Sequence, residues 1–164
     1  MMKKFSFLAF IAIVFMAFTM PAAAEMSLTS SVVKEGGNMP NQYTRKGAKE
    51  GLTTVSPPLQ WTGVPAGTKA FAVIGWNSFL YWAVYNIPGN ATGLPENAQG
   101  IGKVAQEYIT PQEDGPGEYT KHITVYALSA EVKVREGADV ETLRAAMKPL
   151  TLDSADLSYF IILE

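Results

Sequence analysis

The sequence predicts a single, mostly β domain with one late helix. Its 14 glycines and 10 prolines recur at short intervals and separate short apolar runs, which is typical of strands joined by turns and long connections. Three of these runs, at 70–76, 81–87 and 123–128, are rich in aromatic and β-branched residues. Residues 27–33 and 159–163 show the same character more weakly. We expect strands at these five places.

The predicted helix spans residues 139–148. Asp139 is a residue type that caps helices, and Val140, Leu143 and Met147 fall on one helical face at positions i, i+3 and i+7. Pro149 then ends the pattern. We expect this to be the only long helix of the domain.

The first 24 residues have the features of a secretory signal peptide. Lys3 and Lys4 form a basic start, residues 5–20 are almost entirely apolar, and Ala22 to Ala24 provide a small-residue cleavage site. The alternative is a retained membrane anchor, but the apolar run is shorter than the roughly 20 residues that span a bilayer. We therefore predict cleavage after Ala24, no stable membrane anchor after that cleavage, and a single domain at 25–164 in the periplasm or outside the cell.

Composition narrows the partners and cofactors of that domain. Without Lys3 and Lys4, 11 of the 13 basic residues remain against 15 acidic ones, so the formal charge is −4 and a nucleic-acid partner is not expected. The absence of cysteine excludes both disulfides and lipid attachment at a cysteine. With His122 as the single histidine, a zinc site of the usual His and Cys type is excluded as well.

The sequence also contains few residues in the arrangements that catalysis requires. A Ser/His/Asp hydrolase would need His122 as its base, yet no Gly-x-Ser-x-Gly nucleophile elbow occurs, and His122 lies within a predicted strand. Glu113, Asp114 and Glu118 form an acidic group in a Gly/Pro-rich loop, but without the ligand pattern of a calcium loop a solvated loop is the more common outcome. We predict a protein that is not an enzyme and needs no metal or cofactor.

Several segments, in a common order and spacing, resemble the phosphatidylethanolamine-binding protein family, and most closely its bacterial YbhB/YbcL branch, also called Raf kinase inhibitor-like. They are residues 39–44 (MPNQYT), 56–61 (SPPLQW), 64–69 (VPAGTK), 81–88 (YWAVYNIP), 94–95 (LP), 125–128 (VYAL) and 146–148 (AMK). Together they extend over essentially all of residues 25–164. The resemblance implies a β-sandwich-like domain with a central antiparallel sheet, a second small sheet and peripheral helices.

The resemblance also implies an anion pocket, which in the family takes phosphate-like groups and phospholipid headgroups. An Asp-Pro-Asp segment, a histidine before an aromatic residue, a proline-rich loop and a His-Arg-Tyr segment line it. Here the corresponding positions have lost the aspartates and histidines, so the pocket is degenerate. By family position, the implied ligand-binding residues are Trp76, Asn77, Tyr81, Pro111, Tyr119 and Lys121.

Neutral tyrosine hydroxyls replace a histidine that could carry charge, and Lys121 is the one matched position that could still pair with a phosphate. Two outcomes remain open: the aromatic side chains fill the pocket, or they line a pocket re-specialised for an apolar ligand. We therefore predict an exported, non-enzymatic binding protein for a small anion, a lipid headgroup or a small apolar ligand. The alternative is a protein-interaction or inhibitor module, with the loop 112–117 as its contact.

Overall fold

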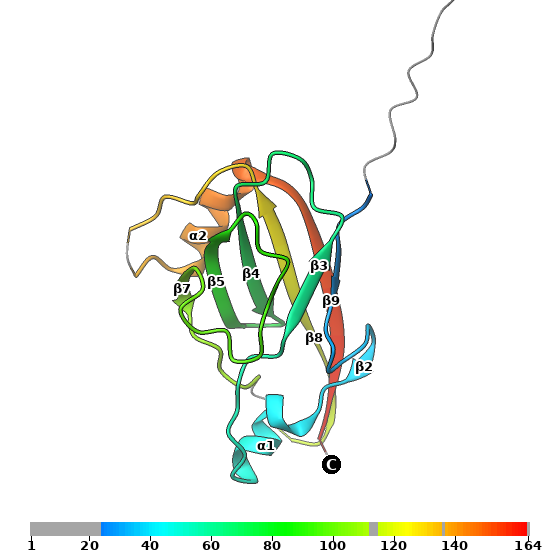
Figure 1. Ribbon diagram of the computed structural model, residues 1–164. Helices are drawn as coiled ribbons and strands as arrows, with labels where there is room; N and C mark the ends of the chain where they lie inside the picture. The colour runs from blue at the N-terminus through cyan, green and yellow to red at the C-terminus, as the bar shows by residue number, and fades with distance from the viewer. Residues whose placement is uncertain (1–23, 112–114, 136, 164) are drawn as a thin grey trace, which may run out of the picture.

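A computed structural model describes residues 24–111, 115–135 and 137–163. Its main sheet has six strands in the order β2-β9-β8-β4-β5-β7, and every neighbouring pair is antiparallel except β2 with β9. Figure 1 shows these strands running side by side. Their bounds are Gly37–Asn38 (β2), Thr151–Leu163 (β9), Gly117–Leu128 (β8), Ala70–Trp76 (β4), Leu80–Pro88 (β5) and Lys103–Gln106 (β7).

A second, smaller sheet packs against one face of the main sheet. It contains β1 (Ser27–Thr29), β3 (Leu59–Thr62) and β6 (Gly93–Leu94), paired in the order β1-β3-β6. Trp61 of β3 lies with its ring centroid 5.0 Å from that of Phe71 in β4, and both side chains are buried. The main hydrophobic core therefore lies between the two sheets, and we call this side of the main sheet its inner face.

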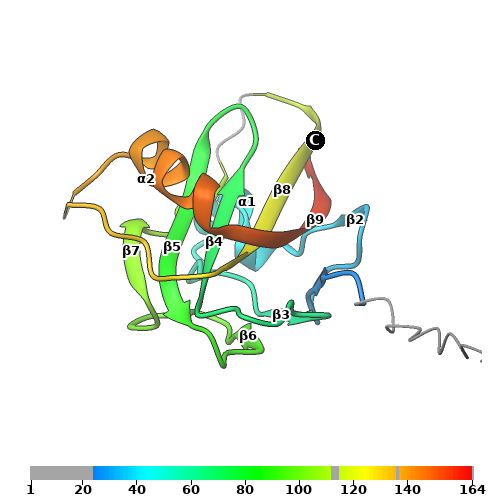
Figure 2. The same cartoon turned by 90° about the horizontal axis from the view of Figure 1, so that it is seen from above.

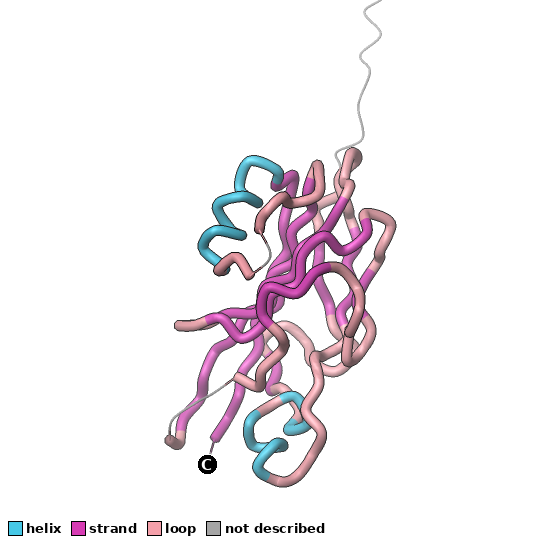
Figure 3. The backbone as a smooth tube through the Cα atoms, turned by 90° about the vertical axis from the view of Figure 1, so that its left-hand side faces the viewer, coloured by secondary structure: helices cyan, strands magenta, loops and turns pink. Residues whose placement is uncertain are grey.

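Helix α2 (Val140–Met147) covers part of the opposite, outer face. Leu143 and Met147 of the helix are buried in a second cluster with Ala72, Ile74 and Leu128 of the sheet. Seen from above in Figure 2, the main sheet lies between α2 and the small sheet, and the tube view in Figure 3 shows the same layers from the side. Helix α1 (Arg45–Lys49) and the 3₁₀ turns η1 (Asn41–Tyr43) and η2 (Lys148–Leu150) are short.

The structure confirms the predicted fold class, with its antiparallel central sheet, small second sheet and late helix. The predicted strands at 70–76 and 81–87 correspond to β4 and β5, and Asp139 caps α2 by accepting the backbone N–H of Thr142 at 2.7 Å. The α-helix ends at Met147, and Pro149 lies within the 3₁₀ turn that follows.

Three predicted strand bounds were wrong. The first strand covers only residues 27–29, because the Ser30 hydroxyl oxygen accepts the backbone N–H of Val32 at 3.4 Å, and such local side-chain bonds compete with a sheet. Strand β8 begins at Gly117 and β9 at Thr151, both earlier than predicted. The early part of β9 alternates buried apolar residues with Asp and Ser, which are poor strand formers on their own.

Asn86 fixes the long segment that leads from β8 to α2. This residue of β5 has a positive φ of 54°, and its side-chain amide donates to the carbonyl of Val132 at 3.0 Å and accepts the N–H of Val132 at 2.7 Å. A single side chain thus satisfies both backbone groups of Val132. Asparagine is one of the few residues that adopt this backbone conformation at low cost.

The predicted signal peptide lies outside the described residues except for Ala24, where the described chain begins. The backbone N–H of Met26 donates to Asp153 of β9 at 3.3 Å, so the chain joins the fold directly after the predicted cleavage point. No helix within the described segments is long and apolar enough to cross a membrane.

Candidate functional site

The predicted site residues gather around one end of strand β8, and the strand separates them by face. Side chains alternate along a strand, so Tyr119 and Lys121 share the inner face while His122 points to the outer face. The burial agrees with this: Lys121 is fully buried, and His122 keeps 30% of its side chain exposed. The predicted opposition of Lys121 and His122 is therefore correct.

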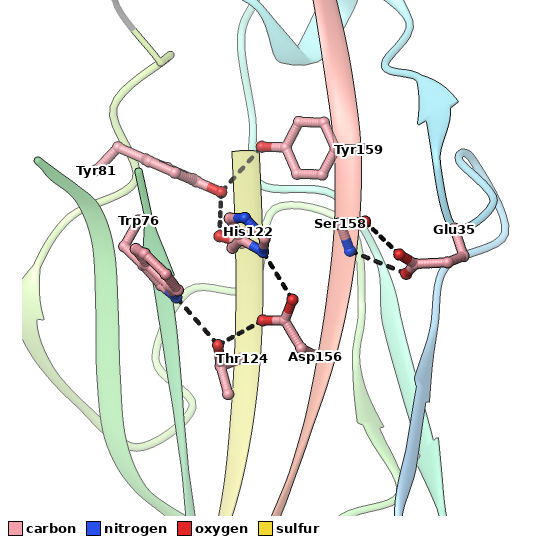
Figure 4. Close-up of polar contacts among 8 residues, drawn as sticks. All are labelled: Glu35, Trp76, Tyr81, His122, Thr124, Asp156, Ser158 and Tyr159. Atoms are coloured by element: carbon pink, nitrogen blue, oxygen red, sulfur yellow. Dashed lines mark hydrogen bonds and ion pairs between the residues drawn. The ribbon is translucent and has the colours of Figure 1, made fainter. Parts of the chain in front are cut away.

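On the inner face lies Tyr81, at the position where the resemblance implies a pocket histidine. Its side chain is fully buried, and its hydroxyl donates to the backbone carbonyl of His122 at 2.6 Å (Figure 4). The hydroxyl of Tyr159 in β9 lies 3.0 Å from the same Tyr81 oxygen. Burial is the main cause that raises the pKa of each tyrosine well above its ordinary value of 10, so both stay neutral at physiological pH.

Gly75 makes room for the Tyr81 ring. A Cβ atom at Gly75 would lie 2.5 Å from the Cε2 atom and 2.8 Å from the Cζ atom of Tyr81, closer than non-bonded carbon atoms approach. The large side chain at position 81 therefore depends on the absence of a side chain at position 75. Tyr81 and Tyr159 fill the space on this face.

Lys121 provides the charge on the inner face. Burial lowers the pKa of its amine from 10.5 to about 8, and its Nζ atom lies 5.6 Å from the centroid of the Phe79 ring. At neutral pH the amine is mostly protonated, so this ammonium group can pair with an anion. Of the other predicted residues, Pro111 is buried and Tyr119 is half-buried. Ile109, two residues before Pro111, donates its backbone N–H to the carbonyl of Tyr81 at 2.9 Å, so this loop runs beside β5.

The remaining predicted residues lie at the turn between β4 and β5. Asn77 stabilises that turn, since its side-chain oxygen accepts the N–H of Phe79 at 3.0 Å. Trp76 is separated from Tyr81 and Lys121, because its place in β4 puts its side chain on the outer face with His122. The predicted residues that belong to β4, β5 and β8 are therefore divided between the two faces of the sheet.

The outer face carries a polar cluster formed by Trp76, His122, Thr124 and Asp156, which we call the outer-face cluster (Figure 4). The Trp76 indole N–H donates to Thr124 Oγ1 at 3.1 Å, and Thr124 donates to Asp156 Oδ1 at 2.7 Å. His122 Nδ1 lies 2.7 Å from Asp156 Oδ2, and its ring stacks on Trp76 with centroids 4.7 Å apart.

A second polar pair, formed by Glu35 and Ser158, lies further along β9. Glu35 accepts the backbone N–H of Ser158 at 2.9 Å and the hydroxyl of the same residue. A surface groove of about 450 Å³ borders the cluster on its other side; its lining residues are Trp76, Asn77, Ser78, Phe79, Glu118, Tyr119, Thr120 and His122. In the described part of the chain, no group of three His, Asp or Glu side chains is placed to hold a metal ion.

Sequence reasoning missed Gly75, Tyr159 and Asp156. Gly75 has a signal in the sequence, because a glycine inside an apolar strand indicates close approach by another group. Tyr159 was expected to belong to a strand, but its partner Tyr81 is distant in sequence and depends on the order of the strands. Asp156 is adjacent to His122 through the β8–β9 register, which the sequence alone does not specify.

Comparisons with known proteins agree with the fold described above. The family model for phosphatidylethanolamine-binding protein matches residues 29–160. A UPF0098 protein of Methanothermobacter thermautotrophicus is 29% identical over 149 residues, covering 80% of this chain and 95% of that protein. The UPF0098 protein YbcL of Escherichia coli is 38% identical over 92 residues, which cover 51% of this chain and 49% of YbcL.

Two solved structures have the same fold. A phosphatidylethanolamine-binding protein homologue from Chlamydia trachomatis superimposes with a TM-score of 0.72 at 24% identity, covering 85% of this chain and 99% of that one. The crystal structure of E. coli YbcL gives a TM-score of 0.69 at 23% identity, with 86% and 100% of the two chains covered. At these identities the likeness establishes the architecture.

Proposed function

The chain belongs to the phosphatidylethanolamine-binding protein family, and from that premise we propose that it is an exported, non-enzymatic binding protein for a small phosphate-like anion or a phospholipid headgroup. The observation that carries the proposal is Lys121, a buried cationic side chain on the inner face at a position where the family has its pocket. A phosphate group would pair with this ammonium, which replaces the family's histidines as the source of attraction.

Burial decides how such a ligand binds. Lys121 is fully buried, so an anion reaches it only after part of the surrounding chain moves aside. The tyrosines contribute neutral hydroxyls, and those of Tyr81 and Tyr159 are already engaged with each other. Affinity therefore rests on a single charge, and we expect binding to be weaker than in a pocket with several donors.

The test is a titration with inorganic phosphate, phosphoethanolamine and vesicles with or without phosphatidylethanolamine, followed by NMR of the Lys121 side chain. We expect Lys121→Met, which keeps the chain length and removes the charge, to weaken phosphate binding about tenfold or more. Lys103→Met, which removes the charge of an exposed lysine in β7, is the matched control. Phosphate binding that survives Lys121→Met would overturn the proposal, while binding to vesicles alone would identify the lipid as the ligand.

Export forms the second part of the proposal and rests on residues 1–24. The chain that would remain after cleavage there is tied to the fold from its second residue, because the backbone N–H of Met26 donates to Asp153. Mass spectrometry of the protein from a bacterial periplasmic fraction should give a chain that begins at Glu25. A full-length chain retained in the cytoplasm would contradict it.

A protein-interaction or inhibitor module is the second candidate. One observation favours it: the buried Tyr81 ring occupies the former pocket, and its hydroxyl is fully engaged inside the protein. Of the contact loop predicted at 112–117, residues 112–114 lie outside the described residues. If no anion binds at millimolar concentration, this candidate becomes the better account.

A further inference from the structure

The outer-face cluster uses all its donors internally. The Trp76 N–H is donated to Thr124, and the Thr124 hydroxyl is donated to Asp156. Because the Asp156 carboxylate lies 2.7 Å from His122 Nδ1, Nδ1 donates to that carboxylate, and in the neutral tautomer Nε2 is left as an acceptor. The cluster therefore offers only acceptors to a ligand: the His122 Nε2 atom and the remaining lone pairs of Asp156.

These acceptors are accessible from solvent. His122 and Asp156 keep 30% and 42% of their side chains exposed, because α2 packs further along the sheet, on Ala72, Ile74 and Leu128. The groove of about 450 Å³ runs beside His122, and half-exposed Phe79 contributes an aromatic surface to it. The stack of His122 on Trp76, inclined by 17°, holds the imidazole in a fixed orientation.

The charges around the groove favour a cation. Glu118 is the acidic residue in the groove lining. The Asp156 carboxylate lies behind this lining, because it contacts His122, which is itself a lining residue. Glu35 lies further along the same side of β9, held by Ser158. An anion would meet carboxylates and no free donor of the cluster, so the chemistry here is the reverse of that around Lys121.

We propose that this groove binds an arginine side chain of a partner protein. A guanidinium group can donate to His122 Nε2 and pair with the Glu118 carboxylate of the groove lining, and its planar face stacks on aromatic rings such as that of Phe79. Lysine fits less well, because its compact, strongly hydrated ammonium neither forms such a fork nor stacks. The site is on the opposite face from Lys121, so it does not rest on anion binding there.

The first test needs no altered protein. The purified protein is titrated with an acetylated and amidated Gly-Arg-Gly-Arg-Gly peptide and with the same peptide carrying citrulline, which keeps the shape of arginine without its charge. We expect a saturable shift of the Trp76 indole N–H resonance with the arginine peptide, and binding about tenfold weaker with citrulline. Equal binding of the two peptides, or no shift up to millimolar concentration, would overturn the proposal.

Variants then locate the contact. His122→Phe keeps a ring stacked on Trp76 but removes Nε2, and Glu118→Gln removes the negative charge of the groove lining at nearly the same size. Each should weaken arginine-peptide binding about tenfold, with an unchanged circular dichroism spectrum. Lys121→Met should alter phosphate binding alone. Arginine-peptide binding that survives both outer-face variants, or is lost in Lys121→Met, would show that the peptide binds elsewhere.

Discussion

The Tyr81 hydroxyl and the Tyr159 hydroxyl lie 3.0 Å apart in the core, and the carbonyl oxygen of His122 determines which of them donates to the other. Tyr81 has one hydroxyl proton and gives it to the carbonyl of His122 at 2.6 Å. The contact between the tyrosines must therefore be a bond from Tyr159 to Tyr81. Through the His122 carbonyl, this inner chain is connected to the residue whose side chain belongs to the outer-face cluster.

This order predicts unequal effects for the two Tyr→Phe substitutions. Tyr81→Phe leaves the buried Tyr159 proton without its acceptor, whereas Tyr159→Phe removes a donor from an oxygen that still makes its own bond. We expect Tyr81→Phe to lower the free energy of unfolding by about 1–3 kcal/mol and Tyr159→Phe by about 1 kcal/mol. Urea unfolding measures both.

The double variant provides the control. With both hydroxyls absent, no buried donor is left over, so the double substitution should cost less than the two single costs added together. Additive costs, or a larger cost for Tyr159→Phe, would contradict the assigned direction.

Gly75→Ala should destabilise the protein through Tyr81 specifically. The added Cβ would lie 2.5 Å from the Tyr81 ring, so the ring or the strand must shift, at a cost of about 1–3 kcal/mol. Tyr81→Leu in the same chain removes the ring atoms that clash and should recover part of this loss, as thermal unfolding would show. If Gly75→Ala is equally costly with Leu at 81, the contact with Trp82 Cβ at 3.1 Å is responsible instead.

The elements that were predictable from sequence are those whose pattern is local. Strand β4 is a continuous apolar run buried on both faces, and α2 combines a cap with an apolar stripe. Strand β9 was predicted only at its end, because the Asp and Ser residues of its first half, Asp153, Ser154 and Asp156, are individually unfavourable in strands. Its full length follows from pairing with β8 over 12 partners, which is a property of the folded sheet.

The candidate site was less predictable for a geometric reason. Family position grouped Tyr81, Lys121 and Trp76 in one implied pocket, whereas the structure has Tyr81 and Lys121 on the inner face and Trp76 on the outer face. Trp76 follows Gly75 at the end of β4, and strand alternation directs it to the outer face. Asp156 carried no sequence signal, since its link to His122 exists only through the β8–β9 register.

Asn86 should hold the backbone around Val132, within residues 129–135, in place. Asn86→Gly keeps the positive φ but removes both hydrogen bonds to Val132, and we expect a loss of about 1–2 kcal/mol in the free energy of unfolding. Asn86→Ala should lose about 1 kcal/mol more, because alanine also strains the backbone at φ 54°. Hydrogen exchange of the Val132 amide is the local measurement, and protection unchanged in Asn86→Gly would rule out this role.

Lys121 should make stability rise with pH above about 8. Burial lowers its pKa from 10.5 to about 8, so between these values the unfolded chain binds a proton that the folded protein has released. Stability increases with pH wherever the unfolded state holds more protons, so unfolding becomes less favourable across this window. The buried Tyr81 and Tyr159 oppose this from about pH 10 upward, because they ionise more readily in the unfolded chain.

The measurement is urea unfolding at intervals from pH 7 to pH 10. The wild-type protein should gain on the order of 1–3 kcal/mol over this range relative to Lys121→Met, which has no amine to titrate. Phosphate should reduce the gain, because an anion bound to the ammonium keeps Lys121 protonated in the folded state and so raises its pKa. A wild-type profile parallel to that of Lys121→Met would mean that the Lys121 amine keeps an ordinary pKa, which its burial argues against.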